Sequence, residues 1–219
     1  DDLVQVKNAI ISVHDKSGIE ELARGLSRAC PDIRIYSTGG TYAALKAALG
    51  PGSDRMLVPM ERYTGQPEMK GGLVKTLDWR IYLGILSEPY DADHDSDRER
   101  AGAVAFDLVV GNLYPFEALS GIPGSFENLR QHVDIGGPCM LRAAAKNFLR
   151  VAAVCDPRDY PAVLDDLGRT GGKLGLELRA RLSRKVFETT SLYDAAIAAF
   201  LASRPAAGLE AEYEIRRGF

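Results

Sequence analysis

The chain has 219 residues, of which 46% are hydrophobic and 26% charged, as expected for a globular protein of one domain or slightly more. Its net charge of −3 argues against general nucleic-acid binding, which usually requires a basic face. No apolar run approaches the length of a membrane span and the N-terminus has no signal-peptide pattern, so a cytoplasmic protein is expected.

The first half of the chain alternates predicted strands and helices. Residues 6–13 (VKNAIISV) form an apolar, β-rich run, and residues 18–30 have helical spacing, with Ser17 as a candidate N-cap. A second strand is predicted at 33–37 and a second helix at 41–49. This β-α-β-α order is typical of a parallel sheet with helices on its faces.

Further elements follow in the second half. Strands are predicted at 81–86, 106–114 and 150–156, and a helix that opens with glycines at 136–148. The run at 106–114 is apolar enough for a central strand. We expect an α/β domain over residues 1–160, a helical subdomain packed on it over 161–204, and a linker or tail over 205–219. The three cysteines lack CxxC spacing, which argues against a disulfide framework or a zinc site.

Two turns near the N-terminus have the features of an anion site. The segments SVHDKSG (12–18) and STGGT (37–41) each join a predicted strand to a predicted helix. Helix N-termini present free N–H groups to anions, and ligands of open α/β sheets bind beyond the carboxyl ends of the strands. Ordinary turns with good caps are the alternative. The nearby segment LVKTL (73–77), with Lys75 and Thr76, favours a phosphate site.

A second polar group is expected at the same edge of the sheet. Asn112 and Tyr114 follow the apolar run at 106–114, and Asp134 precedes the helix that carries Lys146 about three turns further along. Partial burial in the sequence AAAKN would suit Lys146 to proton transfer. Lys146 could fold back toward Asp134 only if the helix start is irregular. An exposed surface lysine is the alternative.

Seven ordered segments resemble one known family. They are SVHDKSG, STGGT, YTGQPEM, VKTL, NLYPF, DIGGP and RAAAKN. Together they resemble the inosine monophosphate (IMP) cyclohydrolase domain of the bifunctional purine-biosynthesis enzyme, over about residues 6 to 203. The resemblance implies the methylglyoxal-synthase-like α/β fold, a parallel sheet with flanking helices and a C-terminal helical extension. The formyltransferase domain of that enzyme would begin where this sequence ends.

The resemblance implies an enzyme that closes a purine ring. The carboxamide nitrogen of a formylated aminoimidazole carboxamide ribotide attacks the formyl carbon, water is lost and IMP forms, a reaction of the cyclic-amidine C–N hydrolase class. No metal or organic cofactor is implied. The implied partner is a ribonucleotide 5′-monophosphate, and a homodimer is left open.

The resemblance also assigns roles to residues. Lys146 is the main proton donor and acceptor, and Asp134 orients or deprotonates the carboxamide. Tyr114 and Lys75 assist at the formyl oxygen. The implied substrate-binding residues are His14, Asp15, Lys16, Ser37, Thr38, Gly39, Gly40, Thr41, Thr76, Gly111, Asn112 and Ile135.

The sequence departs from the family at several positions. The family usually reads close to MDGRVKTLHPK where this chain has KGGLVKTLDWR (70–80), so Leu73 replaces an arginine and Asp78 a histidine. His14 replaces a serine, and Phe148 a histidine. A lost arginine could remove a charge-assisted bond worth roughly 1.5–3 kcal/mol, part of which His14 could supply. Because a carboxylate repels phosphate, we expect Asp78 to point away or to pair with Arg80.

These departures leave alternatives to the standard reaction. One is a paralogue that closes the ring of a purine-like nucleotide, such as the precursor of a C-nucleoside antibiotic. Another is a nucleotide-binding regulatory module without catalysis. The intact set Lys75, Tyr114, Asp134 and Lys146 favours an enzyme. Methylglyoxal synthase is less favoured, because NLYPF and DIGGP belong to the cyclohydrolase.

Overall fold

The computed structural model describes residues 2–67, 75–114, 116 and 126–203. Leu73 and the tail over 205–219, both named above, lie outside the described residues. In chain order, the described elements are β1 (Leu3–Gln5), β2 (Asn8–Val13), α1 (Ile19–Ala29), β3 (Arg34–Ser37), α2 (Gly39–Leu49), η1 (Ser53–Arg55), β4 (Leu57–Pro59), α3 (Met60–Thr64), α4 (Trp79–Leu86), α5 (Ala92–Arg100), β5 (Leu108–Asn112), α7 (Phe126–Gln131), α8 (Gly136–Lys146), β6 (Ala152–Val154), η3 (Pro157–Asp159), α9 (Tyr160–Thr170), β7 (Lys173–Gly175) and α10 (Leu176–Ala202).

The central sheet has five parallel strands in the order β4-β3-β2-β5-β6, which confirms the predicted α/β class. β2 pairs on one side with β3, where Ile11 lies opposite Ser37, and on the other side with β5, where Ile11 lies opposite Val110. The chain therefore builds the sheet outward from β2 first in one direction and then in the other. This reversal makes the carboxyl ends of β2 and β5 a topological switch point, the place where open α/β sheets bind ligands.

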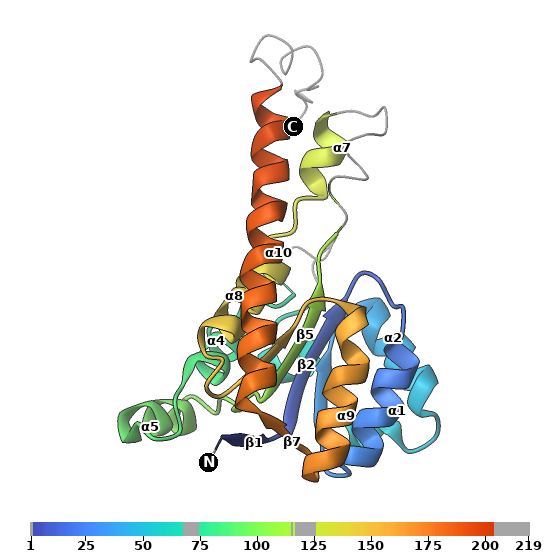
Figure 1. Ribbon diagram of the computed structural model, residues 1–219, viewed down its shortest axis with the longest axis vertical. Coiled ribbons are helices and arrows are strands. Elements are labelled where there is room, and N and C mark those ends of the chain that lie inside the picture. The colour runs from blue at the N-terminus through green and yellow to red at the C-terminus, as the bar shows by residue number, and fades with distance from the viewer. Residues whose placement is uncertain (1, 68–74, 115, 117–125, 204–219) are drawn as a thin grey trace.

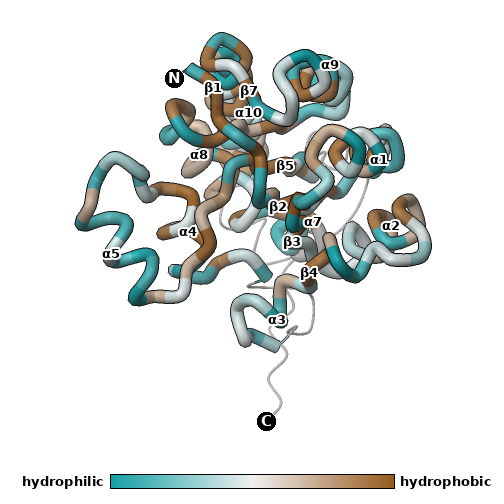
Figure 2. The backbone as a smooth tube through the Cα atoms, turned by 90° about the horizontal axis from the view of Figure 1, so that it is seen from below, coloured by the Kyte–Doolittle hydropathy of each residue, from teal (hydrophilic) through white to brown (hydrophobic). Residues whose placement is uncertain are grey.

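Alternate residues of each strand supply two hydrophobic layers, because successive side chains of a strand point to opposite faces. Ile11 and Val110 belong to the layer that α1, α2 and α9 cover. Ile10 and Val109 belong to the layer that α4, α8 and α10 cover. Figure 2 shows the central strands between these two groups of helices, with the polar helix α5 outermost on one side.

α10 is the longest described helix, and its 27 residues span about 40 Å. It contacts α8 and β6 and then extends past the sheet (Figure 1), while α9 contacts α1 on the other face. Near its start, the buried Arg179 donates hydrogen bonds to the carbonyls of Phe148 (3.0 Å), Asp2 (3.1 Å) and Leu149 (3.2 Å). These bonds fix the base of α10, where β7 also pairs antiparallel with β1.

Two local predictions are wrong. Residues 81–86 belong to the helix α4, because Asp78 caps its N-terminus by accepting a hydrogen bond from the Arg80 amide, and Ile81 and Ile85 are buried one turn apart. A short apolar run fits a buried helix as well as a strand. Ser17 does not cap α1. Its hydroxyl instead donates to Asp15 Oδ1 at 2.7 Å.

Three further findings concern the described residues. The edge strand β4 was not predicted from the sequence, and it pairs with β3. Among the described residues, no helix is both long and apolar enough to cross a membrane. Cys30, Cys139 and Cys155 are all free thiols.

Candidate active site

The two N-terminal turns meet at the switch point. The turn over 14–18 follows β2, and Thr38 ends the connection from β3 to α2. The Lys16 side chain crosses from the first turn to the second, since a Cβ atom at Gly40 would lie 3.7 Å from Lys16 Cε and 3.8 Å from Nζ. The first N–H groups of a helix have no partner within it. A lysine ammonium and the start of α2 therefore face the same space, as an anion site requires.

Asn112 holds the first turn in place. Its Oδ1 accepts hydrogen bonds from the His14 amide at 2.7 Å and the Asp15 amide at 2.9 Å, and its Nδ2 donates to the Asp15 carbonyl at 2.8 Å. The Asp15 carboxylate accepts from both the amide and the hydroxyl of Ser17, and these bonds lower its pKa. Asn112 and Asp15 are predicted to bind substrate, but their described polar contacts stabilise the turn over 14–18 instead.

Two of the predicted hydroxyl donors serve the fold instead. The buried Ser37 hydroxyl donates to the Ile11 carbonyl at 2.6 Å. The buried Thr41 hydroxyl accepts from the Val13 amide at 3.1 Å and donates to the Val13 carbonyl at 3.0 Å. Among the residues that the structure describes, the Thr38 hydroxyl has only a 3.4 Å contact with Ser12 Oγ. Of the three, Thr38 is the hydroxyl with bonding capacity left for a ligand.

Asp134 lies at the start of α8, in a partly buried position. Its Oδ1 accepts a hydrogen bond from the Gly137 amide at 2.9 Å, and its own amide donates to the Tyr193 hydroxyl at 2.8 Å. Burial raises the pKa of the Asp134 carboxyl, while the Gly137 amide and the charge on His14 oppose that shift. A Cβ atom at Gly137 would lie 2.4 Å from Asp134 Oδ2, so a larger residue there would displace this carboxylate.

The segment that carries Lys75 and Thr76 lies against the same helix start. A Cβ atom at Gly136 would lie 2.9 Å from Thr76 Oγ1. Ile135 is 59% exposed beside it, which is unusual for a large apolar side chain. Gly111 at the end of β5 lies close to β2, since a Cβ atom at Gly111 would lie 3.4 Å from the Ser12 carbonyl oxygen. The predicted segments at 75–76, 111–112 and 134–135 therefore all reach the carboxyl edge of the sheet.

An aromatic contact joins the two halves of the region. The rings of His14 and Tyr114 lie 4.3 Å apart at a tilt of 41°, and Tyr114 meets His132 edge to face at 6.2 Å. Tyr114 is 40% exposed, so its face is open to a ligand. Through this contact, the turn after β2 and the segment after β5 form one continuous surface near Asp134.

Sequence reasoning missed Tyr82 on α4. Its hydroxyl is buried, and among the described residues it has no hydrogen-bond partner. Burial raises the pKa of Tyr82 to about 12, and the charges of Cys139 and Asp134 act in the same direction. Tyr82 therefore offers a protonated hydroxyl close to Asp134. Tyr82 lies within residues 81–86, whose apolar pattern predicts a strand. No local sequence pattern indicates that Tyr82 lies near Asp134.

Comparisons with known proteins show the family and the fold of the chain. The family model of the AICARFT/IMPCHase bienzyme matches residues 144–217. The crystal structure of ForH is 35% identical with a TM-score of 0.77, over 90% of this chain and 97% of that one. The chain belongs to the IMP cyclohydrolase domain family. Its similarity to ForH over almost the whole length of both chains confirms the methylglyoxal-synthase-like architecture expected for such domains.

Longer members of the cyclohydrolase family match as well. The bifunctional purine biosynthesis protein PurH of Sorangium cellulosum is 44% identical over 204 residues, which are 93% of this chain and 37% of that protein. PurH of Chlorobium luteolum is 42% identical over 97% of this chain and 41% of its own length. The chain thus spans about two fifths of these relatives.

Lys146, to which the resemblance assigns proton transfer, does not lie at the carboxyl edge of the sheet with the other predicted site residues. It ends α8, whose axis rises about 15 Å from Gly136 to Lys146, and Asn147 next to it donates to the Ile85 carbonyl at 2.8 Å. The helix starts regularly at Gly136, so the irregular start that would let Lys146 fold back is absent from this described segment. The Lys146 side chain is also exposed, so its expected partial burial is wrong.

Asp78, one of the departures from the cyclohydrolase pattern, makes the contacts that the sequence predicts. It is 4% exposed, accepts from the Arg80 amide at 2.8 Å and pairs with Arg80 Nε at 3.4 Å. The expectation that Asp78 pairs with Arg80 is therefore confirmed. Its carboxylate is used to cap α4 and to pair with Arg80.

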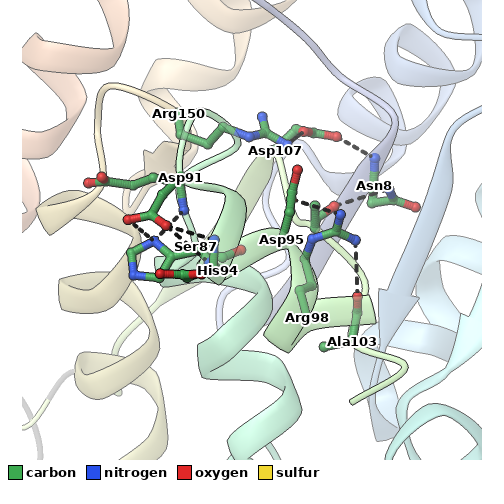
Figure 3. Close-up of polar contacts among 12 residues, drawn as sticks. Asn8, Ser87, Asp91, His94, Asp95, Arg98, Ala103, Asp107 and Arg150 are labelled. Carbon is green, nitrogen blue, oxygen red and sulfur yellow. Dashed lines mark hydrogen bonds and ion pairs between the residues drawn. The ribbon is translucent and has the colours of Figure 1, made fainter. Parts of the chain in front are cut away.

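A second polar cluster lies at the amino edge of the sheet (Figure 3). Asp107 accepts from the Asn8 amide at 2.8 Å and pairs with Arg150 at 2.5 Å, and Arg98 pairs with Asp95 at 3.0 Å. These groups satisfy one another and fix the strand starts and α5, so we assign them a structural role. In the described part of the chain, no three His, Cys, Asp or Glu side chains gather as a metal site would need.

Proposed function

We propose that the chain is an IMP cyclohydrolase: it closes the ring of formylated aminoimidazole carboxamide ribotide, with loss of water, to give IMP. The observation that carries this proposal is the position of Lys16 across Gly40, on the same edge of the sheet as Asp134. One end of this region suits a phosphate and the other holds a desolvated carboxylate. Such a pair matches a nucleotide whose base undergoes proton transfer.

The phosphate end is supported by three kinds of donor. Lys16 supplies positive charge, the start of α2 supplies backbone N–H groups, and Thr38 supplies a hydroxyl. The base end is supported by Asp134, whose raised pKa suits a proton acceptor, and by Tyr114 and Ile135 as exposed flat and apolar surface. Holding the formyl and carboxamide arms together supplies part of the rate enhancement.

The direct test is conversion of the formylated ribotide by the purified chain, followed by ultraviolet absorbance and by chromatographic identification of IMP. Turnover that Asp134→Asn abolishes supports the proposal. Binding of the ribotide without any turnover would instead favour the regulatory module. Faster turnover of a purine-like analogue than of the standard ribotide would favour the specialised paralogue, for which the departure at His14 is the structural argument.

A homodimer is part of the proposal. α10 extends past the sheet and exposes Leu192 (70%), a large apolar side chain that a second copy would cover. Sedimentation of the wild type and of Leu192→Asp would test this, and a monomeric wild type would contradict it. We place the protein in the cytoplasm, because its three cysteines are thiols, as in a reducing compartment.

A further inference from the structure

We propose that His14 is the proton donor to the formyl oxygen in this chain, acting opposite Asp134. The inference rests on the proposed function and adds a catalytic residue to it. His14 stands where the family resemblance expects a serine, and the lysine to which that resemblance assigned proton transfer lies at the other end of α8. His14 is therefore a candidate acid at this edge, beside Tyr114 and Lys75, to which the resemblance assigns an assisting role at the formyl oxygen.

The position of His14 is fixed from two sides. Its amide donates to Asn112 Oδ1 at 2.7 Å, and its carbonyl accepts from Lys16 Nζ at 3.3 Å. Its ring contacts Tyr114 at 4.3 Å between centroids. The backbone is thus held by the anion site while the ring points to the base end. A side chain so placed lies between a bound phosphate and the reacting arms.

The charged neighbours of His14 come from three segments. Asp15 and Lys16 flank it in its own turn, the Tyr114 ring contacts its ring just after β5, and its charge acts on the carboxyl group of Asp134 at the start of α8. The positive charge that His14 can carry acts on both carboxylates and opposes the rise in the pKa of Asp134. An imidazolium and a carboxylate on two sides of one space form an acid and a base.

The proton balance closes with these two groups. The carboxamide nitrogen forms a bond to the formyl carbon, its proton passes to Asp134, and the formyl oxygen takes the proton of the His14 imidazolium. The C–O bond then breaks, and the hydroxyl leaves as water with the proton held by Asp134. The former formamide nitrogen gives its proton to His14. Both side chains return to their starting states, and no oxidant or metal takes part.

The test compares His14→Gln with the wild type over a range of pH. We expect kcat to fall about 100-fold or more, because general acid catalysis contributes about 10²–10⁴-fold, while KM changes less than about 3-fold. Loss of the proton donor should change the pH profile of kcat in His14→Gln relative to the wild type, and imidazole should partly restore His14→Ala.

Two further variants make the test specific. His94→Gln is the matched control, since His94 lies on α5 at the other edge of the sheet and should leave turnover unchanged. Circular dichroism and calorimetric binding of IMP show that each variant is folded. Full turnover and an unchanged pH profile in His14→Gln, with turnover lost in Lys146→Ala, would overturn the inference while the proposed function stands. A wild type without any turnover would overturn both.

Discussion

The Thr41→Val substitution tests whether the Thr41 hydroxyl stabilises the fold or binds a ligand. Thr41 is 4% exposed, and its hydroxyl makes both an accepted and a donated hydrogen bond with the backbone of Val13. Valine has almost the same shape but cannot make either bond. The two polar groups of Val13 would then remain buried without these partners, at the point where β2 leads into the turn over 14–18.

The expected cost follows from those two bonds. Each contributes about 1 kcal/mol net, and leaving the buried partners unpaired adds about 1–2 kcal/mol in total. The sum is about 3–4 kcal/mol of unfolding free energy. In a domain of this size, each kcal/mol lowers Tm by about 2–4 °C, so Tm should fall by roughly 6–16 °C.

Thermal unfolding by circular dichroism measures this effect. Thr41→Ser keeps the hydroxyl and should retain most of the stability. Thr38→Val makes the same chemical change at a hydroxyl with only a 3.4 Å contact, and should cost less than about 1 kcal/mol. An unchanged Tm for Thr41→Val, together with weaker nucleotide binding, would show that the Thr41 hydroxyl binds the ligand and would refute this reasoning.

Three further predictions concern ionisable groups. Asp134→Asn should abolish turnover without lowering Tm, because it removes a desolvated charge yet keeps the acceptor for the Gly137 amide; a large loss of Tm would contradict this. Tyr82→Phe should raise the stability by about 1 kcal/mol, since the buried hydroxyl has no partner among the described residues; a lower Tm would contradict this. Hydrogen bonds from Arg158 and Lys185 depress the pKa of Asp156, so the stability that they give is present above about pH 4 and is lost on acidification below it. Urea unfolding from pH 7 to pH 3 should therefore show a smaller acid loss for Asp156→Asn than for the wild type.

Periodicity was sufficient to predict most of the sheet. The strand at β2, the helix α1 and the strand at β5 show clear spacing, and their alternate residues fill two hydrophobic layers. α4 was missed because its apolar run is short and rich in isoleucine, and the deciding feature was the cap at Asp78. β4 was missed because three residues carry too little pattern.

The site was harder to predict residue by residue. The segments that reach the carboxyl edge follow from strand order, so the neighbourhood of Lys16, Asn112 and Asp134 was accessible from sequence. The role of each side chain could not be predicted from the sequence. Thr41 bonds to the backbone of a residue 28 positions away, and Tyr193 to the backbone of one 59 positions away. Nothing in the sequence near Thr41 distinguishes a hydroxyl that joins the start of α2 to β2 from one that binds phosphate.

The central claim is that one edge of the sheet holds a nucleotide by its phosphate and closes its ring. The most direct measurement is kcat/KM of the wild type for the formylated ribotide and for the same compound without its 5′-phosphate. Three contacts with a phosphate at about 1.5 kcal/mol each predict conversion of the ribotide to IMP and a kcat/KM that is about 10³-fold lower for the riboside. Equal values for the two compounds, or no conversion of a ribotide that binds, would contradict the account.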